Sequence, residues 1–240
     1  MHRRIDENIG DAACSPAPYF DFGAQIQIGL TDTAPACTRA ILGGGQVYSD
    51  CVEAAIYLTG QARQRVIWGV GISRKNVRHY SFDILEGACQ LIGSRNWDVP
   101  RCTYVPCVSA MSPLFDAPAS PVHDVVLYLH AGKSAGIPLP PEVPMMMNND
   151  GTLAQALAFL ASGATVVTNS YHGTYWGMCL GRRVLCLPFS NKFRQFRENP
   201  VFADPADWPA HIAAAEVRWG VLDEARSLNR AFYERVMNLG

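Results

Sequence analysis

The sequence predicts an α/β protein with two small Rossmann-like halves, each built on a parallel sheet. Short aliphatic runs alternate with helical stretches along the chain, which is typical of strand–helix–strand units. The run from Asp124 to Leu129 is apolar without alternation, as expected for a strand buried on both faces of a parallel sheet. Glycine or polar residues follow several predicted strands, at the edge where open α/β sheets bind ligands.

The first half is expected to contain short strands and one clear helix. The strands are predicted at residues 40–42, 66–68, 90–93 and 103–105, and the helix at 50–61. A proline-rich stretch at 112–121 is predicted to be a loop, because proline cannot continue a helix or an inner strand. We therefore predict an N-terminal half over residues 1–118 and a C-terminal half over residues 119–240.

The second half repeats the alternation. A helix is predicted from residue 153, where apolar residues keep the spacing of one helix face. Asp150 or Thr152 could cap this helix, and Gly163 could end it. The remaining predicted elements are strands at 124–129, 166–168 and 184–188, a loop at 137–144, a helix at 176–180 and an amphipathic helix at 222–239.

Composition limits the classes of function. The chain has 240 residues, of which 49% are hydrophobic and 17% charged, so a large buried core is expected. The net charge of −1 gives no electrostatic case for nucleic acid or for an anionic membrane. No apolar run is long enough to span a bilayer, and the N-terminus lacks the apolar core of a signal peptide. The expected location is the cytoplasm, with peripheral association with a membrane assembly left open.

The eight cysteines do not show metal-ligand spacing. No CxxC pair occurs, so we predict no disulfide framework and no metal site. A cysteine nucleophile is also disfavoured, because no cysteine has a histidine nearby in the sequence; a pairing in space is left open.

The segment 166–176 is the strongest functional signal. A β-branched run gives way to Asn169, Ser170, Tyr171, His172 and Gly173, a pattern that predicts a strand, a tight turn and a helix. Histidine suits proton transfer near neutral pH, and glycine lets a ligand approach the backbone. A histidine in this place can also be only a capping or packing residue.

Other candidates also follow predicted strands or open helices. Asn8, Gly10 and Asp11 form a turn that is read most simply as a helix cap. Gly44 and Gly45 could cradle a phosphate through backbone N–H groups. Gly71 and Ser73 follow the second strand, but no GxGxxG motif is complete because residue 74 is arginine, so no dinucleotide site is predicted.

Three basic side chains are candidates for substrate binding. Arg95 could bind a phosphate or a carboxylate, or could simply pair with Asp98 in the turn. His130 ends the strand at 124–129, and Lys192 follows the strand at 184–188. Lys192 could equally be a solvated surface lysine.

These motifs together resemble the polysaccharide pyruvyl transferase family. The match runs from about residue 8 to 197 and comprises, in order, Asn8–Asp11, Gly43–Gly45, Trp68–Gly71, Ser94–Asn96 and Ser170–Gly173. The resemblance implies a GT-B-like fold with a cleft between two Rossmann-like halves. It also implies transfer of a pyruvyl group from phosphoenolpyruvate to a sugar hydroxyl, which forms a ketal, with no cofactor.

The resemblance assigns roles to particular residues. His172 matches the active-site histidine, the expected acid for the enol carbon, and Asp11 is the candidate base. The acceptor would be a saccharide or a lipid-linked saccharide, the precursor of a cell-surface or exopolysaccharide glycan. Family members carry an arginine two residues before this histidine, where this chain has Ser170. Lys192, Arg95 or Arg74 would have to supply that charge.

Two other functions fit the same sequence. A GT-B-like glycosyltransferase that uses a nucleotide sugar would need the same glycine loops. A glycan-binding or assembly subunit could keep the fold without the chemistry.

Overall fold

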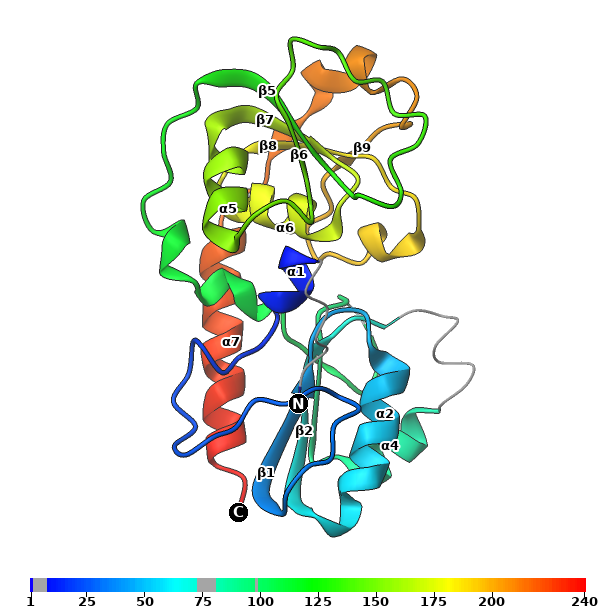
Figure 1. The fold of residues 1–240 in the computed structure, drawn as a ribbon, viewed down its shortest axis with the longest axis vertical. Helices are drawn as coiled ribbons and strands as arrows, with labels where there is room; N and C mark the ends of the chain where they lie inside the picture. Colours follow the sequence, from blue (N-terminus) through cyan, green and yellow to red (C-terminus); the bar gives the residue numbers. More distant parts are fainter. Residues whose placement is uncertain (2–7, 73–80, 98) are drawn as a thin grey trace.

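A computed structural model describes residues 1, 8–72, 81–97 and 99–240, and these form two parallel-stranded sheets one above the other (Figure 1). This confirms the predicted α/β class with two sheets of mainly parallel strands. The first sheet contains β1 (Cys37–Gly43), β2 (Ala62–Val70), β3 (Leu91–Ser94) and β4 (Thr103–Tyr104), in the order β1-β2-β3-β4. Each pair of neighbouring strands is parallel.

The first sheet is covered on both faces. On one face, α2 (Tyr48–Tyr57) and α4 (Phe82–Ala88) pack with Leu42 and Ile67 of the sheet. The short helix η1 (Leu58–Gly60) continues α2. On the other face, Val66 and Trp68 pack against the C-terminal helix α7 (Val221–Met237). Burial on both faces explains why the second part of β2, from Val66 to Val70, carries no polar side chain.

The second sheet has the order β10-β8-β7-β5-β6, and β9 pairs with β8. Its strands are β5 (His123–Leu129), β6 (Met145–Met147), β7 (Gly163–Thr168), β8 (Arg183–Cys186), β9 (Val201–Phe202) and β10 (Glu216–Val217). The strand pairs are parallel except β10 with β8, which is antiparallel.

Strand β5 shows why its sequence does not alternate. Val126 and Tyr128 face the cluster formed with α5 (Leu153–Ser162) and α6 (Tyr171–Cys179). Leu127 and Leu129 face the opposite side, where they pack with Trp208 of η5 (Trp208–Ala214). Both faces are therefore buried, as the sequence predicted.

The predicted start and end of α5 are confirmed. Thr152 is the N-cap, and with Gln155 it forms a reciprocal capping box, so Thr152 rather than Asp150 fills this role. Gly163 ends the helix and begins β7. The other short helices are α1 (Ile9–Ala12), η2 (Val108–Met111), η3 (Pro113–Phe115) and η4 (Asn191–Arg194).

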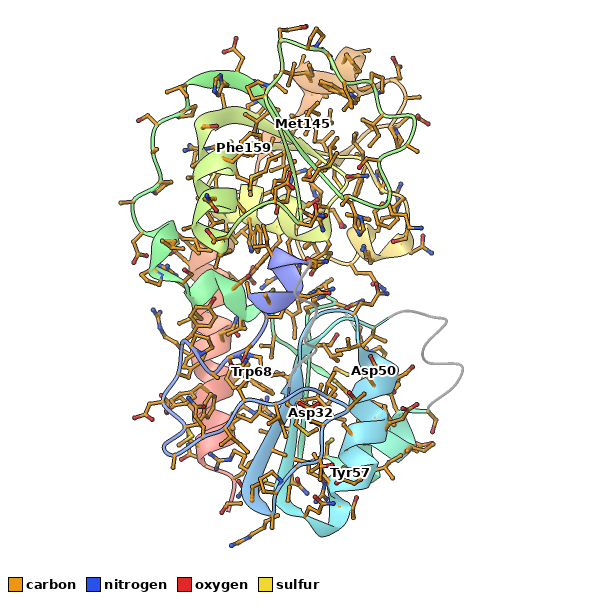
Figure 2. All side chains as sticks on the ribbon, viewed as in Figure 1. Asp32, Asp50, Tyr57, Trp68, Met145 and Phe159 are labelled. Atoms are coloured by element: carbon orange, nitrogen blue, oxygen red, sulfur yellow. The ribbon has the colours of Figure 1, made fainter. Side chains whose placement is uncertain are left out.

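Helix α7 starts on the second half and ends on the first (Figure 1). Ala225 packs in the cluster around α6, whereas Phe232 lies against Trp68 with ring centroids 5.0 Å apart. Figure 2 shows Trp68 on the side of β2 that faces α7. The boundary near residue 118 stays a prediction, and α7 is an element that packs on both sides of it.

Helix α1 also joins the two halves. Ile9 donates its backbone N–H to the carbonyl of Asn148 at 3.3 Å, and Ala13 and Cys14 pack in the cluster around α6. Of the helices in the described ranges, none is long and apolar enough to cross a bilayer.

Substitution of Asn229 should loosen α7 from the first sheet. The buried Asn229 side chain accepts from Trp68 Nε1 at 2.9 Å and donates to the carbonyl of Pro106 at 3.1 Å. Asn229→Ala leaves both partners unsatisfied, which should lower the free energy of unfolding by about 1–3 kcal/mol. Urea unfolding measures this, and the exposed neighbour substitution Arg230→Ala is the control, with an expected change within about 0.5 kcal/mol. Equal losses in both variants would contradict the anchoring role of Asn229.

Candidate functional site

The carboxyl ends of strands from both sheets meet around α1. Gly44 and Gly45 follow β1, Gly71 follows β2 and Arg95 follows β3. From the second sheet, His130 follows β5, the segment 169–172 follows β7 and Lys192 follows β8. The predicted site residues therefore come together at the edges where α/β sheets bind ligands.

Helix α1 has the predicted cap and an unusually close neighbour. The side-chain oxygen of Asn8 accepts from the backbone N–H groups of Gly10 (3.0 Å) and Asp11 (3.3 Å), so Asn8 has a structural role. A Cβ atom on Gly10 would lie 1.9 Å from Nδ1 of His172. Only glycine allows this approach of α1 to α6.

The glycine loop after β1 faces Asp11. Gly44 and Gly45 have φ values of 104° and 86°, which favour glycine. A Cβ on Gly45 would lie 2.5 Å from Oδ1 of Asp11. The carboxylate of Asp11 therefore occupies the space beside Gly45 in which the sequence suggested a phosphate.

His172 lies where the sequence predicted it, after β7 and in the first turn of α6, but it is buried. Its Nε2 atom lies 3.3 Å from Sγ of Cys14 and 3.6 Å from Sγ of Cys107. Its ring also contacts Trp176, with centroids 5.2 Å apart. The imidazole thus points its Nε2 at two thiols rather than into the cleft that Arg95 and Lys192 line.

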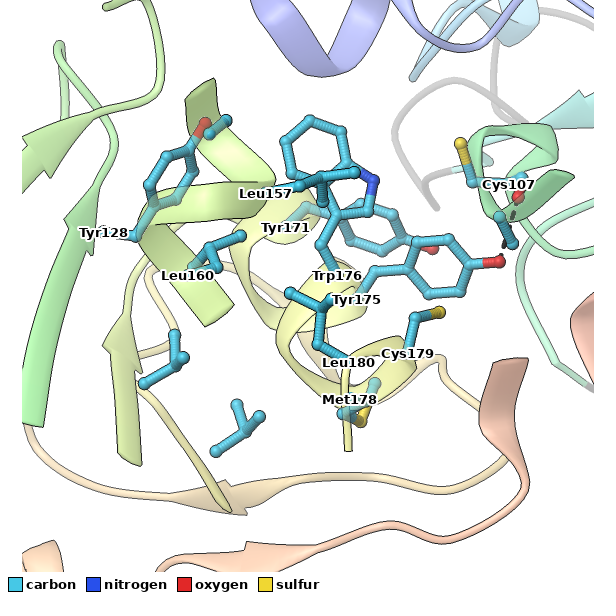
Figure 3. Packing of buried hydrophobic residues seen from close by; sticks show 14 of the residues in the cluster. Cys107, Tyr128, Leu157, Leu160, Tyr171, Tyr175, Trp176, Met178, Cys179 and Leu180 are labelled. Atoms are coloured by element: carbon cyan, nitrogen blue, oxygen red, sulfur yellow. Dashed lines mark hydrogen bonds between the residues drawn. The ribbon is translucent and has the colours of Figure 1, made fainter. Parts of the chain in front are cut away.

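The two cysteines near His172 are close to one another. Their Sγ atoms are 3.4 Å apart, and Cys107 also contacts Oγ of Ser109 at 3.2 Å. Hydrogen bonding from Cys14 and, after it, from His172 lowers the pKa of Cys107, while the same thiol pairing and burial raise the pKa of Cys14. Figure 3 shows Cys107 beside Tyr175, whose hydroxyl donates to the Cys107 carbonyl at 2.9 Å. The sequence missed this cluster because its members come from separate segments.

Three of the predicted binding residues hold the local structure. Asn169 accepts from the backbone N–H of His130 at 2.7 Å and donates to the carbonyl of Lys133 at 2.8 Å. Ser170 is the N-cap of α6 and accepts from the N–H of Gly173 at 3.3 Å. A Cβ on Gly173 would lie 2.5 Å from Thr168 and from the ring of Tyr128, so glycine is needed for α6 to pack on the sheet.

Arg95 is a buried cation that contacts both halves of the protein. Its guanidinium carbon lies 4.0 Å from the centroid of the Tyr171 ring. Tyr171 belongs to α6, so this contact joins the two halves. A Cβ on Gly71 would lie 2.8 Å from Nε of Arg95, so Gly71 makes room for this side chain. The Nη1 atom of Arg95 is buried and has no hydrogen-bond partner among the described residues. Asp98, the alternative partner, lies outside the described residues, as do Ser73 and Arg74.

Lys192 lies across the cleft from Arg95. The two side chains line a narrow cleft together with Gly71 and Tyr171. Burial, followed by the positive charge of Arg95, lowers the pKa of Lys192 to about 8, and the carboxylate of Asp11 opposes this shift. Burial and then Lys192 lower the pKa of His130, whose Nδ1 accepts from the N–H of Gly132 at 3.1 Å. The charges of Arg95, Lys192, Asp11 and His130 thus act on one another across the two halves.

A larger cavity of about 670 Å³ lies elsewhere, along the edge strand β1 and under the segment 15–28. It contains none of the predicted site residues, so we place the candidate site at the narrow cleft, where the cations converge.

Comparisons of the chain with family models, with curated proteins and with solved structures found no match.

Adding a methyl group to Gly10 should separate α1 from α6. Gly10→Ala would force the His172 imidazole or the helix to move, and such overpacking typically costs about 1–3 kcal/mol. Gly87→Ala in α4 is the matched control, because a Cβ there meets nothing within 4 Å and should stabilise the protein by about 0.4–1 kcal/mol. Opposite shifts in the midpoint of thermal unfolding are expected. Similar shifts of the same sign would show that Gly10 is not sterically constrained.

Anion binding in the cleft should weaken as pH rises through the pKa of Lys192. The side chain is charged below about pH 8 and neutral above it. Sulfate keeps its charge over this range, so titration calorimetry with sulfate between about pH 6.5 and 9.5 isolates the lysine. The affinity of the unmodified protein should fall with pH, whereas Lys192→Arg should bind with little pH dependence. The same pH profile in both proteins would remove Lys192 from the anion site.

Proposed function

We propose that the protein is a transferase that binds an anionic, phosphate-bearing donor in the cleft between its two halves. The observation that carries this proposal is the buried guanidinium of Arg95, whose Nη1 atom has no hydrogen-bond partner within the described part of the chain and which lines the same cleft as Lys192. A buried donor without a partner costs about 1–3 kcal/mol, which an acceptor oxygen of a ligand would recover. An anion is the ligand that satisfies both side chains at once.

The resemblance in the sequence leads us to propose phosphoenolpyruvate as the donor and a sugar hydroxyl of a glycan precursor as the acceptor. This donor carries a phosphate and a carboxylate, which match two cations in one cleft. Ser170 has a different role from the arginine of family members, because its hydroxyl caps α6. The ring of the neighbouring Tyr171 instead contacts the guanidinium of Arg95, which follows a strand of the first sheet. We propose that Arg95 replaces the missing charge from the opposite side of the cleft.

The transfer needs an acid for the enol carbon and a base for the acceptor hydroxyl. The role of His172 as the acid stays a prediction, and it requires the imidazole to turn away from the two thiols. Lys192 is an alternative acid within the cleft, because a pKa of about 8 suits proton transfer near neutral pH. Asp11 remains the proposed base, since its carboxylate acts on both Arg95 and Lys192.

Donor entry requires movement. The described residues leave no space for a water molecule in the cleft, so side chains that line it must shift when a donor binds. Closure over a bound donor would exclude water, which strengthens the electrostatic interactions and limits hydrolysis.

A glycosyltransferase that uses a nucleotide sugar is the second candidate. The orientation of His172 favours it, because a histidine directed at thiols is not positioned to protonate an enol carbon. The diphosphate of a nucleotide sugar would satisfy Arg95 and Lys192 equally well.

Phosphoenolpyruvate should raise the thermal stability of the protein, because a ligand that binds only the native state stabilises it. Lys192→Ala should weaken phosphoenolpyruvate binding by about 1.5–3 kcal/mol through loss of a charge-assisted contact, and should leave a neutral acceptor sugar unaffected. Calorimetry measures both affinities. The exposed Lys133→Ala is the control that removes the same charge outside the cleft.

The outcomes separate the candidates. Stabilisation by a nucleotide sugar alone would favour the glycosyltransferase, and stabilisation by neither ligand would favour a binding subunit. Equal affinity of Lys192→Ala and the unmodified protein for phosphoenolpyruvate would show that Lys192 is not the cationic side chain that binds the donor. Arg95 would then be the next residue to substitute.

A further inference from the structure

Three metal-ligating atoms converge at the junction of the two halves. The Sγ atoms of Cys14 and Cys107 and the Nε2 atom of His172 are separated by 3.4, 3.3 and 3.6 Å. All three side chains are buried, with exposed fractions of 6%, 2% and 6%. They come from the segment after α1, the segment before η2 and the first turn of α6. No role in the proposed transfer explains why two thiols surround this imidazole.

The separations match one face of a tetrahedral zinc site. Zinc–sulfur bonds of about 2.3 Å and zinc–nitrogen bonds of about 2.0–2.1 Å at tetrahedral angles place two sulfurs about 3.8 Å apart and a sulfur and a nitrogen about 3.6 Å apart. The three observed distances are within a few tenths of an ångström of these values. Small side-chain rotations would complete the geometry.

We propose that Cys14, Cys107 and His172 bind one zinc ion through two thiolates and one imidazole. This set of ligands selects zinc over magnesium or calcium, which prefer oxygen. Two thiolates neutralise the charge of Zn²⁺, so the complex can be buried at lower cost than an unpaired ion.

Two oxygen atoms lie beside the thiols. The carbonyl of Gly10 lies 3.0 Å from Sγ of Cys14, and Oγ of Ser109 lies 3.2 Å from Sγ of Cys107. Ser109 already accepts from Nε1 of Trp176 at 3.0 Å, so its oxygen is held in place. A carbonyl, a hydroxyl or one water can therefore complete four-coordination.

The zinc ion would fasten the two halves together. Cys107 follows the last strand of the first sheet, His172 belongs to α6 of the second, and Cys14 follows α1, which lies between them. This site does not rest on the proposed transfer, and it leaves Lys192 as the acid, because an imidazole bound to zinc is held away from the cleft. Zinc binding can be measured without any substrate, so failure of the donor experiments leaves it standing.

A disulfide is the competing explanation for two neighbouring thiols. It would require the sulfurs to approach to about 2.05 Å, and it would leave Nε2 of His172 without the thiol contacts that orient it. A metal uses all three atoms, whereas a disulfide uses two.

The test uses the full chain without added substrate. Elemental analysis after purification in zinc-containing buffer without chelator should find about one zinc per chain. Replacement by Co²⁺ should give a thiolate-to-cobalt charge-transfer band and the strong visible bands of a tetrahedral complex. Cys107→Ala should lose zinc affinity at least tenfold, while Cys51→Ala, a buried thiol in the first half, should keep it.

Several results would overturn the zinc site. They are a metal-free protein under zinc-replete conditions, a cobalt spectrum without thiolate bands, unchanged zinc affinity in Cys107→Ala, or a Cys14–Cys107 disulfide found by peptide mapping without reductant. The cobalt spectrum is recorded on the unmodified protein, so the test holds even where a variant does not fold.

Discussion

The contact between Gly10 and His172 is the constraint on which the junction of the two halves depends. Because Gly10 has no Cβ, α1 can approach α6 until its backbone touches the imidazole ring. That approach brings Cys14 to the thiol of Cys107 and Asp11 to the glycine loop after β1. A single larger side chain at position 10 would separate all of these groups together.

The junction of the two halves also holds two positively charged side chains that are largely buried from water. Arg95 reaches from the first sheet to stack on Tyr171 of the second, and Lys192 lies on the other side of the cleft. Burial first, and then repulsion by the neighbouring guanidinium of Arg95, lower the pKa of Lys192. Asp11 relieves only part of this repulsion. An arrangement that is costly without a ligand and favourable with an anion is typical of a binding site.

The sequence predicted the two sheets because burial on both faces leaves an apolar run, as in β5 and in the second part of β2. It missed α4 and β6, since a seven-residue helix and a run of three methionines carry little periodicity. It placed His172 correctly along the chain but not its orientation. The thiols that decide this orientation lie 158 and 65 residues away. Asn169, Ser170 and Gly173 were predicted to bind a ligand, but they hold the local structure. In a sequence, residues that cap and pack a helix resemble residues that bind a ligand.

Helix α7 has a consequence for the order in which the chain can fold during synthesis. The face of the first sheet that carries Val66 and Trp68 is completed by Phe232 and Val236, which are synthesised more than 150 residues later. Until then this aromatic surface is only partly covered, by the segment that includes Phe20 and Phe22. The first half therefore leaves the ribosome with an unfinished core, and contacts of such long sequence separation form slowly. During that interval the exposed side of β2 is a surface on which chaperones can act and chains can aggregate.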